Sequence, residues 1–204
     1  MPGMLITQIA ELDKKRIHIF LEGGKSFVLY RGEGRKYSLQ EGEELSQEQY
    51  EEICNDILIK RARKRTMHLL EKMDRTESQL REKLWQGFYP EDIIDDAIDY
   101  VKGFHYLDDV RYAHNYVRNQ KDKKSQRKIW MELMKKGIEK ETIAQALEEE
   151  YQQEKEQDLI LKWIEKKNYS SEKADLKEKQ RMYQFLMRKG FQSDDILHVL
   201  DYLT

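Results

Sequence analysis

The chain has 204 residues, of which 37% are charged and 39% hydrophobic, with 2 prolines, 10 glycines and 1 cysteine. High charge with few helix-breaking residues is typical of a mostly helical protein, and the length suits one sizeable domain or several small helical modules. The single cysteine excludes an internal disulfide and a cysteine-based metal cage, and it fits a reducing cytoplasm.

The beginning of the chain lacks a cationic leader followed by an apolar core. No apolar run approaches the roughly 20 residues that a membrane-spanning helix needs. We therefore expect no secretory signal, no membrane contact and a cytoplasmic location.

The net charge of −2 conceals an uneven distribution along the chain. Residues 1–57 carry 7 basic and 11 acidic side chains, residues 58–140 carry 20 and 14, and residues 141–204 carry 10 and 14. The middle segment, at +6, is where we expect a polyanion or an acidic protein surface to bind. Exposed helix faces rich in Lys and Arg explain the same excess equally well.

Residues 4–32 contain three short β-branched and aromatic runs, MLITQIAEL, RIHIFLEG and KSFVLYRG. Gly23 and Gly24 separate the second run from the third, which is a hairpin signal. The next residues predict a loop with a short strand around 36–39. We expect a small antiparallel sheet of three or four strands that packs on the helix after it.

Helical periodicity begins at Ser46, which is placed to cap a helix with Gln49 in the capping-box position. Tyr50, Ile53, Cys54 and Ile57 form an apolar stripe on this helix. Cys54 is accordingly predicted to be a buried small hydrophobe and not a nucleophile.

Three segments repeat: LWQGFYPEDIIDDAI from Leu84, MKKGIEKETIAQAL from Met134 and MRKGFQSDDILHVL from Met187. They align at spacings of 50 and 53 residues. The aligned triples are Gly87/Phe88/Ile93, Gly137/Ile138/Ile143 and Gly190/Phe191/Ile196. Repeats of this length indicate tandem modules that stack.

Each glycine is predicted to end a helix in the left-handed conformation, with the Phe or Ile after it folding back onto that helix. The acidic stretch that follows is predicted to cap the next helix. A leading helix, near 58–73, 108–121 or 155–168, completes three helices per module. The fold class is therefore mostly α: tandem three-helix repeats in an elongated curved array, with a small N-terminal antiparallel β extension. The expected divisions are 1–45, 46–106, 107–152 and 153–204.

Asp108 and Asp109 pose a choice between a catalytic pair and a helix start. Adjacent helical side chains diverge by about 100°, which suits a shared catalytic water poorly. Asp108 as N-cap and Asp109 in the first turn suit the exposed amides there, and Tyr112, Ala113 and Tyr116 then form a core-facing stripe. Capping is favoured over catalysis.

Residues 106–138, YLDDVRYAHNYVRNQKDKKSQRKIWMELMKKGI, resemble the signature segment of the RecX family, bacterial regulators of the RecA recombinase. The pattern is a YLDD start, the RYA at 111–113, a basic run at 121–128, the helix with Ile129, Glu132 and Leu133, and a closing KGI. FLMRKGF (185–191) and TESQLREKLWQGF (76–88) match the other modules, so the resemblance covers about 58–202. Ser125 stands where the family commonly has glycine, and EKEQDL at 154–159 interrupts any continuous basic surface.

The resemblance implies tandem three-helix repeats and no enzyme activity. It also implies binding in the groove of RecA filaments on single-stranded DNA, with lower ATP hydrolysis and strand exchange. A curved stack of modules suits a helical groove. The cations expected at the partner or DNA surface are Lys60, Arg61, Arg63, Lys64, Arg65, Arg111, Arg118, Lys121, Lys123, Lys124, Arg127 and Lys128.

A solvated basic helix face is the alternative for these cations. Tyr112, Tyr116 and Trp130 lie among them, and their helical spacing favours core packing over base stacking. Trp130 aligns with Leu80 and Tyr183. The five histidines show no zinc-protease spacing and the glycines no phosphate-loop spacing, so we expect no metal, nucleotide or other cofactor.

The main hypothesis is a monomeric inhibitor of the RecA filament, with weak direct binding of DNA. A sequence-independent DNA-binding protein that acts indirectly on repair is the alternative, and steep salt dependence would mark it. A hydrolase that uses an Asp/Glu pair is the third interpretation.

Overall fold

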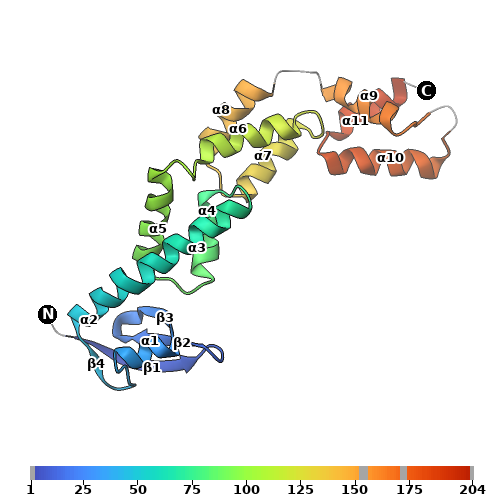
Figure 1. Ribbon diagram of the computed structural model, residues 1–204. Coiled ribbons are helices and arrows are strands. Elements are labelled where there is room, and N and C mark those ends of the chain that lie inside the picture. Colours follow the sequence, from blue (N-terminus) through green and yellow to red (C-terminus); the bar gives the residue numbers. More distant parts are fainter. Residues whose placement is uncertain (1–2, 152–155, 171–173, 203–204) are drawn as a thin grey trace. The chain divides into compact units, whose positions relative to one another are not determined.

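Figure 1 shows the protein as a computed structural model, which describes residues 3–151, 156–170 and 174–202. The chain divides into two compact units, Met1–Asp108 and Asp109–Thr204. The first unit contains the sheet and the helices as far as α5, and the second has helices joined by turns, with no strand among its described residues. The mostly helical fold with a small N-terminal antiparallel sheet is therefore confirmed.

The sheet has the strand order β3-β2-β1-β4, and every neighbouring pair is antiparallel. Its strands are β1 Met4–Glu11, β2 Arg16–Leu21, β3 Ser26–Tyr30 and β4 Glu44–Leu45. The predicted hairpin turn is a short 3-10 helix, η1 Glu22–Gly24, in which Gly23 has φ 81°. A side chain would be strained in that conformation, so the two glycines fix the turn.

The prediction of a short strand around residues 36–39 is wrong. The chain forms helix α1 Arg31–Lys36 instead, and the fourth strand, β4, pairs with Met4 and Leu5 of β1. The amide N–H of Tyr30 donates to the Glu33 carboxylate at 2.8 Å, which satisfies a donor at the start of α1. Glu33 also binds Arg61, 28 residues away, and this tertiary contact favours the helix over a strand.

A long helical segment follows as α2 Gln47–Glu52, the π-helical turn η2 Ile53–Leu58 and α3 Ile59–Lys72. Ser46 caps it as predicted: the amide of Gln49 donates to the Ser46 hydroxyl at 3.2 Å, and Gln49 returns to the cap backbone. Cys54 is buried, and burial raises the pKa of its thiol. The prediction that Cys54 is buried is confirmed, and the raised pKa disfavours the thiolate form that a nucleophile needs.

Helices α4 Glu77–Trp85 and α5 Glu91–Gly103 flank α3 (Figure 1). One hydrophobic core joins them to the sheet, and it includes Ile6, Phe27, Ile53, Leu84 and Ile98. This shared core confirms the expectation that the sheet packs on the helix that follows it. A small sheet needs such packing because it buries too little apolar surface by itself.

The second unit contains two three-helix groups, each with its own core. With α3, α4 and α5 of the first unit counted as the first three-helix group, the second group is α6 Asp109–Gln120, α7 Gln126–Lys135 and α8 Lys140–Glu150. The third group is α9 Glu156–Lys166, α10 Leu176–Lys189 and α11 Ser193–Tyr202. The three leading helices, α3, α6 and α9, lie within two residues of their predicted bounds.

The first repeat is shifted by one residue relative to the sequence alignment. Leu84, Leu133 and Leu186 are the fully buried equivalents, whereas Met134 and Met187, aligned above with Leu84, are 37% and 43% exposed. Four residues after each leucine the backbone is left-handed, at Phe88 (φ 62°), Gly137 (79°) and Gly190 (93°). The prediction holds for the two later glycines and is wrong for Gly87.

Gly87 is needed for space and not for its φ angle. A Cβ on it would lie 3.0 Å from Cε2 of Tyr89 and 3.1 Å from the carbonyl oxygen of Leu84. Tyr89 therefore takes the folded-back place that Ile138 and Phe191 occupy in the later repeats, both of which are buried. The side chain of Phe88, predicted to fold back, is 42% exposed.

For the third helices of the first two repeats, α5 and α8, the predicted caps are correct only in their charge. Pro90 and Glu139 precede α5 and α8, and neither side chain makes a capping hydrogen bond. Acidic side chains do occupy the first turns, namely Glu91, Asp92, Glu141, Asp194 and Asp195. They favour the helices through the positive end of the helix dipole.

Asp108 directly precedes α6, whose first turn contains Asp109. Changing Asp108 to Ala should lower the free energy of unfolding by about 1 kcal/mol, as loss of an N-cap usually does. Denaturant titration measures it, with Asp122→Ala, an exposed loop residue, as the control. Unchanged stability in the Asp108 variant would contradict the capping role.

Candidate interface for an anionic partner

The basic cluster on α3 is partly used to hold the first unit together. Arg61 pairs with the Glu33 carboxylate at 2.5 and 2.7 Å and donates to the carbonyl of Val28 at 3.3 Å. Arg63 pairs with both Asp96 oxygens, at 2.6 and 2.8 Å. These two predicted contact residues tie α3 to the sheet region and to α5, a role the sequence did not distinguish from partner binding.

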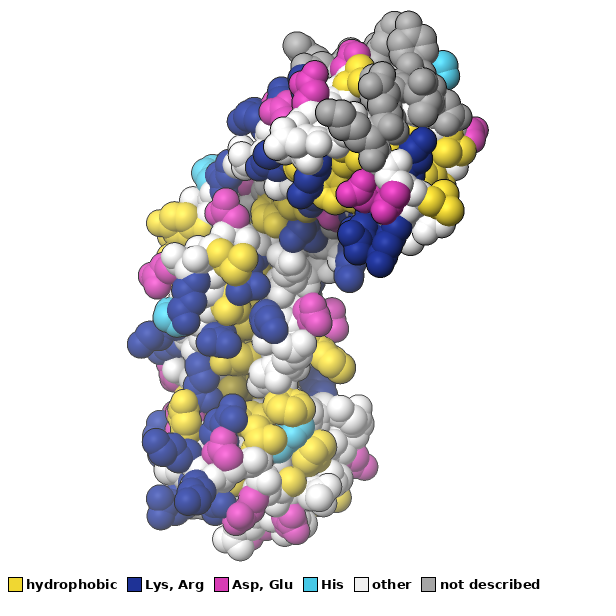
Figure 2. All heavy atoms as spheres, turned by 90° about the vertical axis from the view of Figure 1, so that its right-hand side faces the viewer, with side chains coloured by type: hydrophobic (Ala, Val, Ile, Leu, Met, Phe, Trp, Pro, Cys, Tyr) yellow, Lys and Arg dark blue, Asp and Glu magenta, His cyan; other side chains and the backbone are white. Residues whose placement is uncertain are grey.

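Lys60, Lys64 and Arg65 are the exposed members of the α3 cluster. Lys60 pairs with Asp56 at 2.7 Å, one turn earlier. Lys64 and Arg65 have no acidic partner among the described residues. Figure 2 shows Lys and Arg side chains beside hydrophobic ones over this unit, in the lower part of the view.

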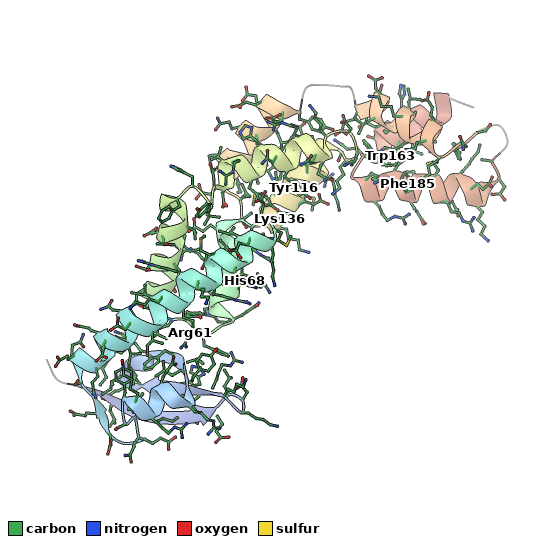
Figure 3. All side chains as sticks on the ribbon, viewed as in Figure 1. Arg61, His68, Tyr116, Lys136, Trp163 and Phe185 are labelled. Atoms are coloured by element: carbon green, nitrogen blue, oxygen red, sulfur yellow. The ribbon has the colours of Figure 1, made fainter. Side chains whose placement is uncertain are left out.

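Lys64 and Arg65 line a groove of about 770 Å³, hereafter the α3 groove. Its other walls include Tyr30 from β3 and Phe88 from the α4–α5 turn. Arg61 and His68, labelled in Figure 3, lie along it on α3. The groove combines free cations with exposed aromatic rings, a combination that binds single-stranded nucleic acid in other proteins.

In the second unit, Arg118 and Lys121 hold α6 against the end of α8. Nε of Arg118 donates to the Glu150 carboxylate at 3.0 Å, and Lys121 donates to the Glu150 carbonyl at 3.2 Å. His114 Nδ1 lies 3.2 Å from the same carboxylate. Arg118 lowers the pKa of Glu150, so the carboxylate stays charged and the clamp persists at neutral pH.

Lys124 belongs to a network around Tyr116. Its ammonium pairs with Glu132 at 2.7 Å, and the Tyr116 hydroxyl donates to the same carboxylate at 2.6 Å. Burial and the Glu132 charge raise the pKa of Tyr116, so the hydroxyl stays protonated. Tyr116 and Tyr112 pack against the domain core, which confirms the core prediction for them.

Lys123, Arg127 and Lys128 are the predicted residues of this unit without an acidic partner among its described residues. Lys123 and Arg127 are exposed. Arg111 is exposed as well, on the first turns of α6. Ser125 accepts from the Lys128 amide at 3.2 Å as the N-cap of α7, so this serine has a structural role at the start of the helix.

Sequence reasoning missed a lysine–aromatic cluster, defined by Lys166, Lys167 and Lys189 around Trp163 and Phe185. The Lys189 ammonium lies 4.2 Å from the centre of the Trp163 ring, and both rings are labelled in Figure 3. Burial lowers the pKa of Lys189, and nearby lysines add to the effect. The adjacent lysines at 166–167 could have indicated a basic site in the sequence, but the acidic residues at 154–159 argued against a basic surface there.

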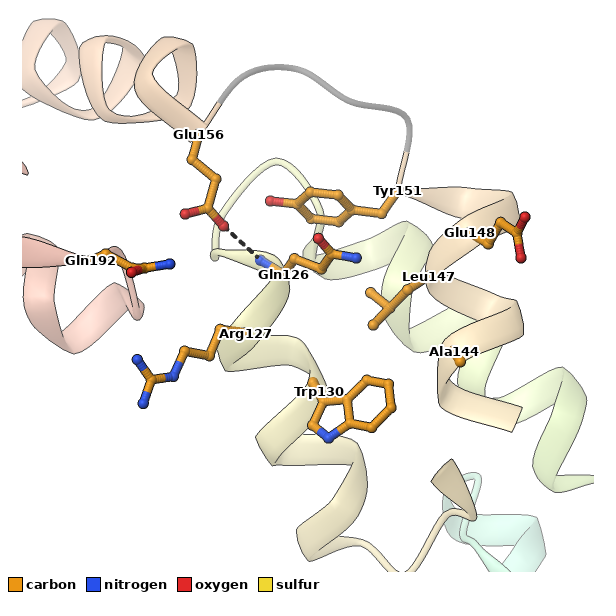
Figure 4. A pocket seen from close by; sticks show the side chains of 9 residues that line it. All are labelled: Gln126, Arg127, Trp130, Ala144, Leu147, Glu148, Tyr151, Glu156 and Gln192. Carbon is orange, nitrogen blue, oxygen red and sulfur yellow. Dashed lines mark hydrogen bonds between the residues drawn. The ribbon is translucent and has the colours of Figure 1, made fainter. Parts of the chain in front are cut away.

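The second and third three-helix groups meet beside Trp130, in the pocket shown in Figure 4. The amide of Gln126 at the start of α7 donates to the Glu156 carboxylate at 3.3 Å. Trp130 packs partly against the α6–α8 core, as predicted. Its alignment with Leu80 is wrong, because the shifted register makes the buried Ile129 the equivalent of Leu80.

Glu156 should make the stability of the second unit depend on pH. Burial raises the pKa of its carboxyl above the ordinary value of 4.5, against the opposing Gln126 hydrogen bond. A carboxyl whose pKa is higher in the folded state than in the unfolded state stabilises the fold at pH values below its ordinary pKa of 4.5. This stabilisation is lost as the pH rises through the raised folded-state pKa. A Glu156→Gln variant should therefore gain thermal stability relative to the unmodified protein as pH rises.

Melting temperatures from about pH 4 to about pH 7 test this sign. Glu148→Gln, an exposed residue on the same pocket, is the control and should follow the unmodified protein. The predicted pH effect is contradicted if the melting temperature of the unmodified protein rises relative to that of Glu156→Gln as the pH increases over that range.

Among the described residues, no group of three or more His, Cys, Asp or Glu side chains is arranged to hold a metal ion. Within the same residues, no helix is long and apolar enough to cross a membrane. The arrangement consists of surface cations, exposed rings and internal ion pairs, which suits binding of an anionic partner.

Comparison with known families gives three matches in chain order. The first, second and third three-helix domains of RecX match residues 62–100, 108–147 and 154–200. "Regulatory protein RecX" of Caldanaerobacter subterraneus subsp. tengcongensis is 32% identical over 200 residues, covering 97% of this chain and 99% of the relative. The protein of the same name from Clostridium botulinum (strain Eklund 17B / Type B) is 30% identical over 197 residues, covering 95% and 92%.

Solved structures agree with these matches. A crystal structure of regulatory protein RecX aligns with a TM-score of 0.57 and 26% identity, covering 98% of this chain and 100% of that one. RecX from Lactobacillus salivarius aligns with a TM-score of 0.58 and 26% identity, covering 72% and 96%. With three domains matched in order and a relative aligned over nearly its whole length, this chain belongs to the RecX family of regulatory proteins.

Proposed function

We propose that this chain regulates the RecA recombinase by binding RecA filaments on single-stranded DNA and lowering their ATP hydrolysis and strand exchange. Membership of the RecX family supports the regulatory role. The observation that carries the binding mode is that each unit has exposed cations without an acidic partner among its described residues: Lys64 and Arg65 in the first, Lys123 and Arg127 in the second.

Unpaired surface cations favour binding of a polyanion because no internal ion pair has to break. Arg61, Arg63, Arg118 and Lys124 are engaged with carboxylates inside their own units. Binding therefore draws on Lys64, Arg65, Lys123 and Arg127, which have no acidic partner among the described residues. A filament offers both phosphates and acidic protein surface to such side chains.

Filament binding can be measured by co-sedimentation with RecA assembled on single-stranded DNA, at several salt concentrations. The double variant Lys123→Glu/Arg127→Glu should bind the filament at least about ten-fold more weakly, because two negative side chains would then face an anionic partner in place of two positive ones. Lys14→Glu/Lys177→Glu changes the net charge equally at exposed positions elsewhere and is the control. Equal binding of the filament by the two double variants would contradict the proposal that Lys123 and Arg127 contact it.

A sequence-independent DNA-binding protein that acts indirectly on repair is the second candidate, favoured by the α3 groove. A parallel titration with bare single-stranded DNA separates the two. Tighter binding to the filament than to bare DNA supports filament regulation. Equal binding with steep loss at high salt supports the second candidate.

A further inference from the structure

The turn after α4 places a strained phenylalanine where the later repeats have glycine. Phe88 has φ 62°, at the position equivalent to Gly137 and Gly190. A bulky side chain is unusual in this conformation, which disfavours every residue except glycine. Such strain often occurs at functional sites. The ring gains little from burial, since 42% of the residue is exposed.

The Phe88 ring packs against the imidazole of His18. Its centre lies 4.7 Å from that of the His18 imidazole, which in turn lies 4.1 Å from the ring of Phe20. His18 is buried, and burial lowers its pKa, so the imidazole is neutral at neutral pH. Phe88 therefore packs on one side against a neutral imidazole ring.

A second exposed ring, Tyr30, lines the same groove and is 46% exposed. The Arg61 guanidinium carbon lies 4.7 Å from its ring centre, while Glu33 pairs with that guanidinium. Arg61 thus fixes Tyr30, and its own charge is largely neutralised. The rings of Phe88 and Tyr30 are therefore both supported on one side within the α3 groove.

Free positive charge lines the groove beside these rings. Lys64, Arg65 and Lys83 have no acidic partner among the residues that the structure describes, and Lys83 donates only to Gln86, at 3.1 Å. The cations come from α3 and α4, whereas the rings come from β3 and the α4–α5 turn. Phosphates and bases of one extended strand could thus be contacted at once, which a double helix with its bases stacked inside would not permit.

We propose that the α3 groove binds a single strand of DNA, with a base stacked on Phe88 and its phosphates held by Lys64, Arg65 and Lys83. The choice of DNA as the strand rests on the proposed function. The groove itself belongs to the first unit alone and is assigned by its own rings and charges. The sheet thereby acquires a role, since β2 and β3 supply His18 and Tyr30.

Fluorescence anisotropy with a labelled oligothymidylate, in the absence of recombinase, tests the proposal. Phe88→Gly removes the ring and relieves the backbone strain, so the variant should fold at least as well as the unmodified protein. Its affinity should fall roughly ten-fold, as loss of one stacked base predicts. Trp85→Ala, which removes a ring that is 71% exposed and outside the groove, should bind normally.

The charge contribution is measured by salt dependence. Lys64→Gln/Arg65→Gln should reduce the slope of log affinity against log salt by about 0.7 for each phosphate that the variant no longer neutralises. A duplex of equal length should bind more weakly than the single strand, and Phe88→Gly should not weaken its binding further. Unchanged single-strand affinity in Phe88→Gly, or equal affinity for duplex, overturns the proposal.

This experiment is separable from the test of filament regulation because no recombinase is present. If Phe88→Gly loses bare-strand binding, the groove is established whatever the filament assay gives. If the groove fails while filament binding persists, the proposed function stands on the other surfaces.

Discussion

Replacing Gly190 with alanine should destabilise the second unit by roughly 2–4 kcal/mol. Gly190 ends α10 with φ 93°, a conformation that costs a side chain about 1–2 kcal/mol. An added Cβ would also lie 2.5 Å from Cβ of Lys128 and 2.6 Å from Oγ of Ser125. These are atoms near the backbone of α7, which have little freedom to move away.

The close approach at Gly190 matters because it joins the second and third three-helix groups. The Ser125 amide donates to the Lys189 carbonyl at 3.2 Å beside it. Thermal unfolding followed by tryptophan emission should report the destabilisation, since Trp163 lies in the third group and Trp130 beside the junction.

Gly42→Ala separates backbone strain from steric overlap. Gly42 has φ 82°, but an added Cβ would meet nothing within 4 Å. Its cost should be confined to the strain of about 1–2 kcal/mol. A Gly190→Ala variant no less stable than Gly42→Ala would mean that the junction relaxes and is not tightly packed.

Truncation of Leu133 should cost 2–5 kcal/mol, roughly the range for fully buried leucines, whereas truncation of Met134 should cost under about 1 kcal/mol. Leu133 is completely buried in the α6–α8 core, and Met134, its neighbour in α7, is 37% exposed. The pair tests the repeat register, because the sequence alignment equated Met134 with the buried Leu84.

The same comparison is available in α10 with Leu186→Ala and Met187→Ala. Denaturant midpoints at constant slope measure all four variants. If the methionine variants lose as much stability as the leucine variants, the structural register is wrong and the alignment through Gly87 is right.

The helical modules were predictable because their signals are local. Apolar periodicity placed α3, α6 and α9 within two residues, and the Ser46 capping box marked the start of α2. The sheet was equally visible in its β-branched runs and paired glycines. Helix α1 was missed because the Glu33–Arg61 pair that supports it joins residues 28 apart.

The candidate surface was only partly predictable for the same physical reason. Sequence identifies a cation but not the carboxylate that folding brings to it, such as Asp96 for Arg63, 33 residues away, or Glu150 for Arg118, 32 away. The α3 groove was not predicted because the first repeat was aligned one residue out of register. With Gly87 aligned to Gly137, Phe88 was expected to fold inward, whereas the structure exposes it.

The most direct test of the proposed function is ATP hydrolysis by RecA on single-stranded DNA, with this protein added at increasing amounts. We expect inhibition at ratios well below those that coat the DNA, because a filament-directed regulator acts on an assembly and not on each nucleotide. No inhibition, or inhibition that begins only when the DNA is saturated with the protein, would contradict regulation of the filament.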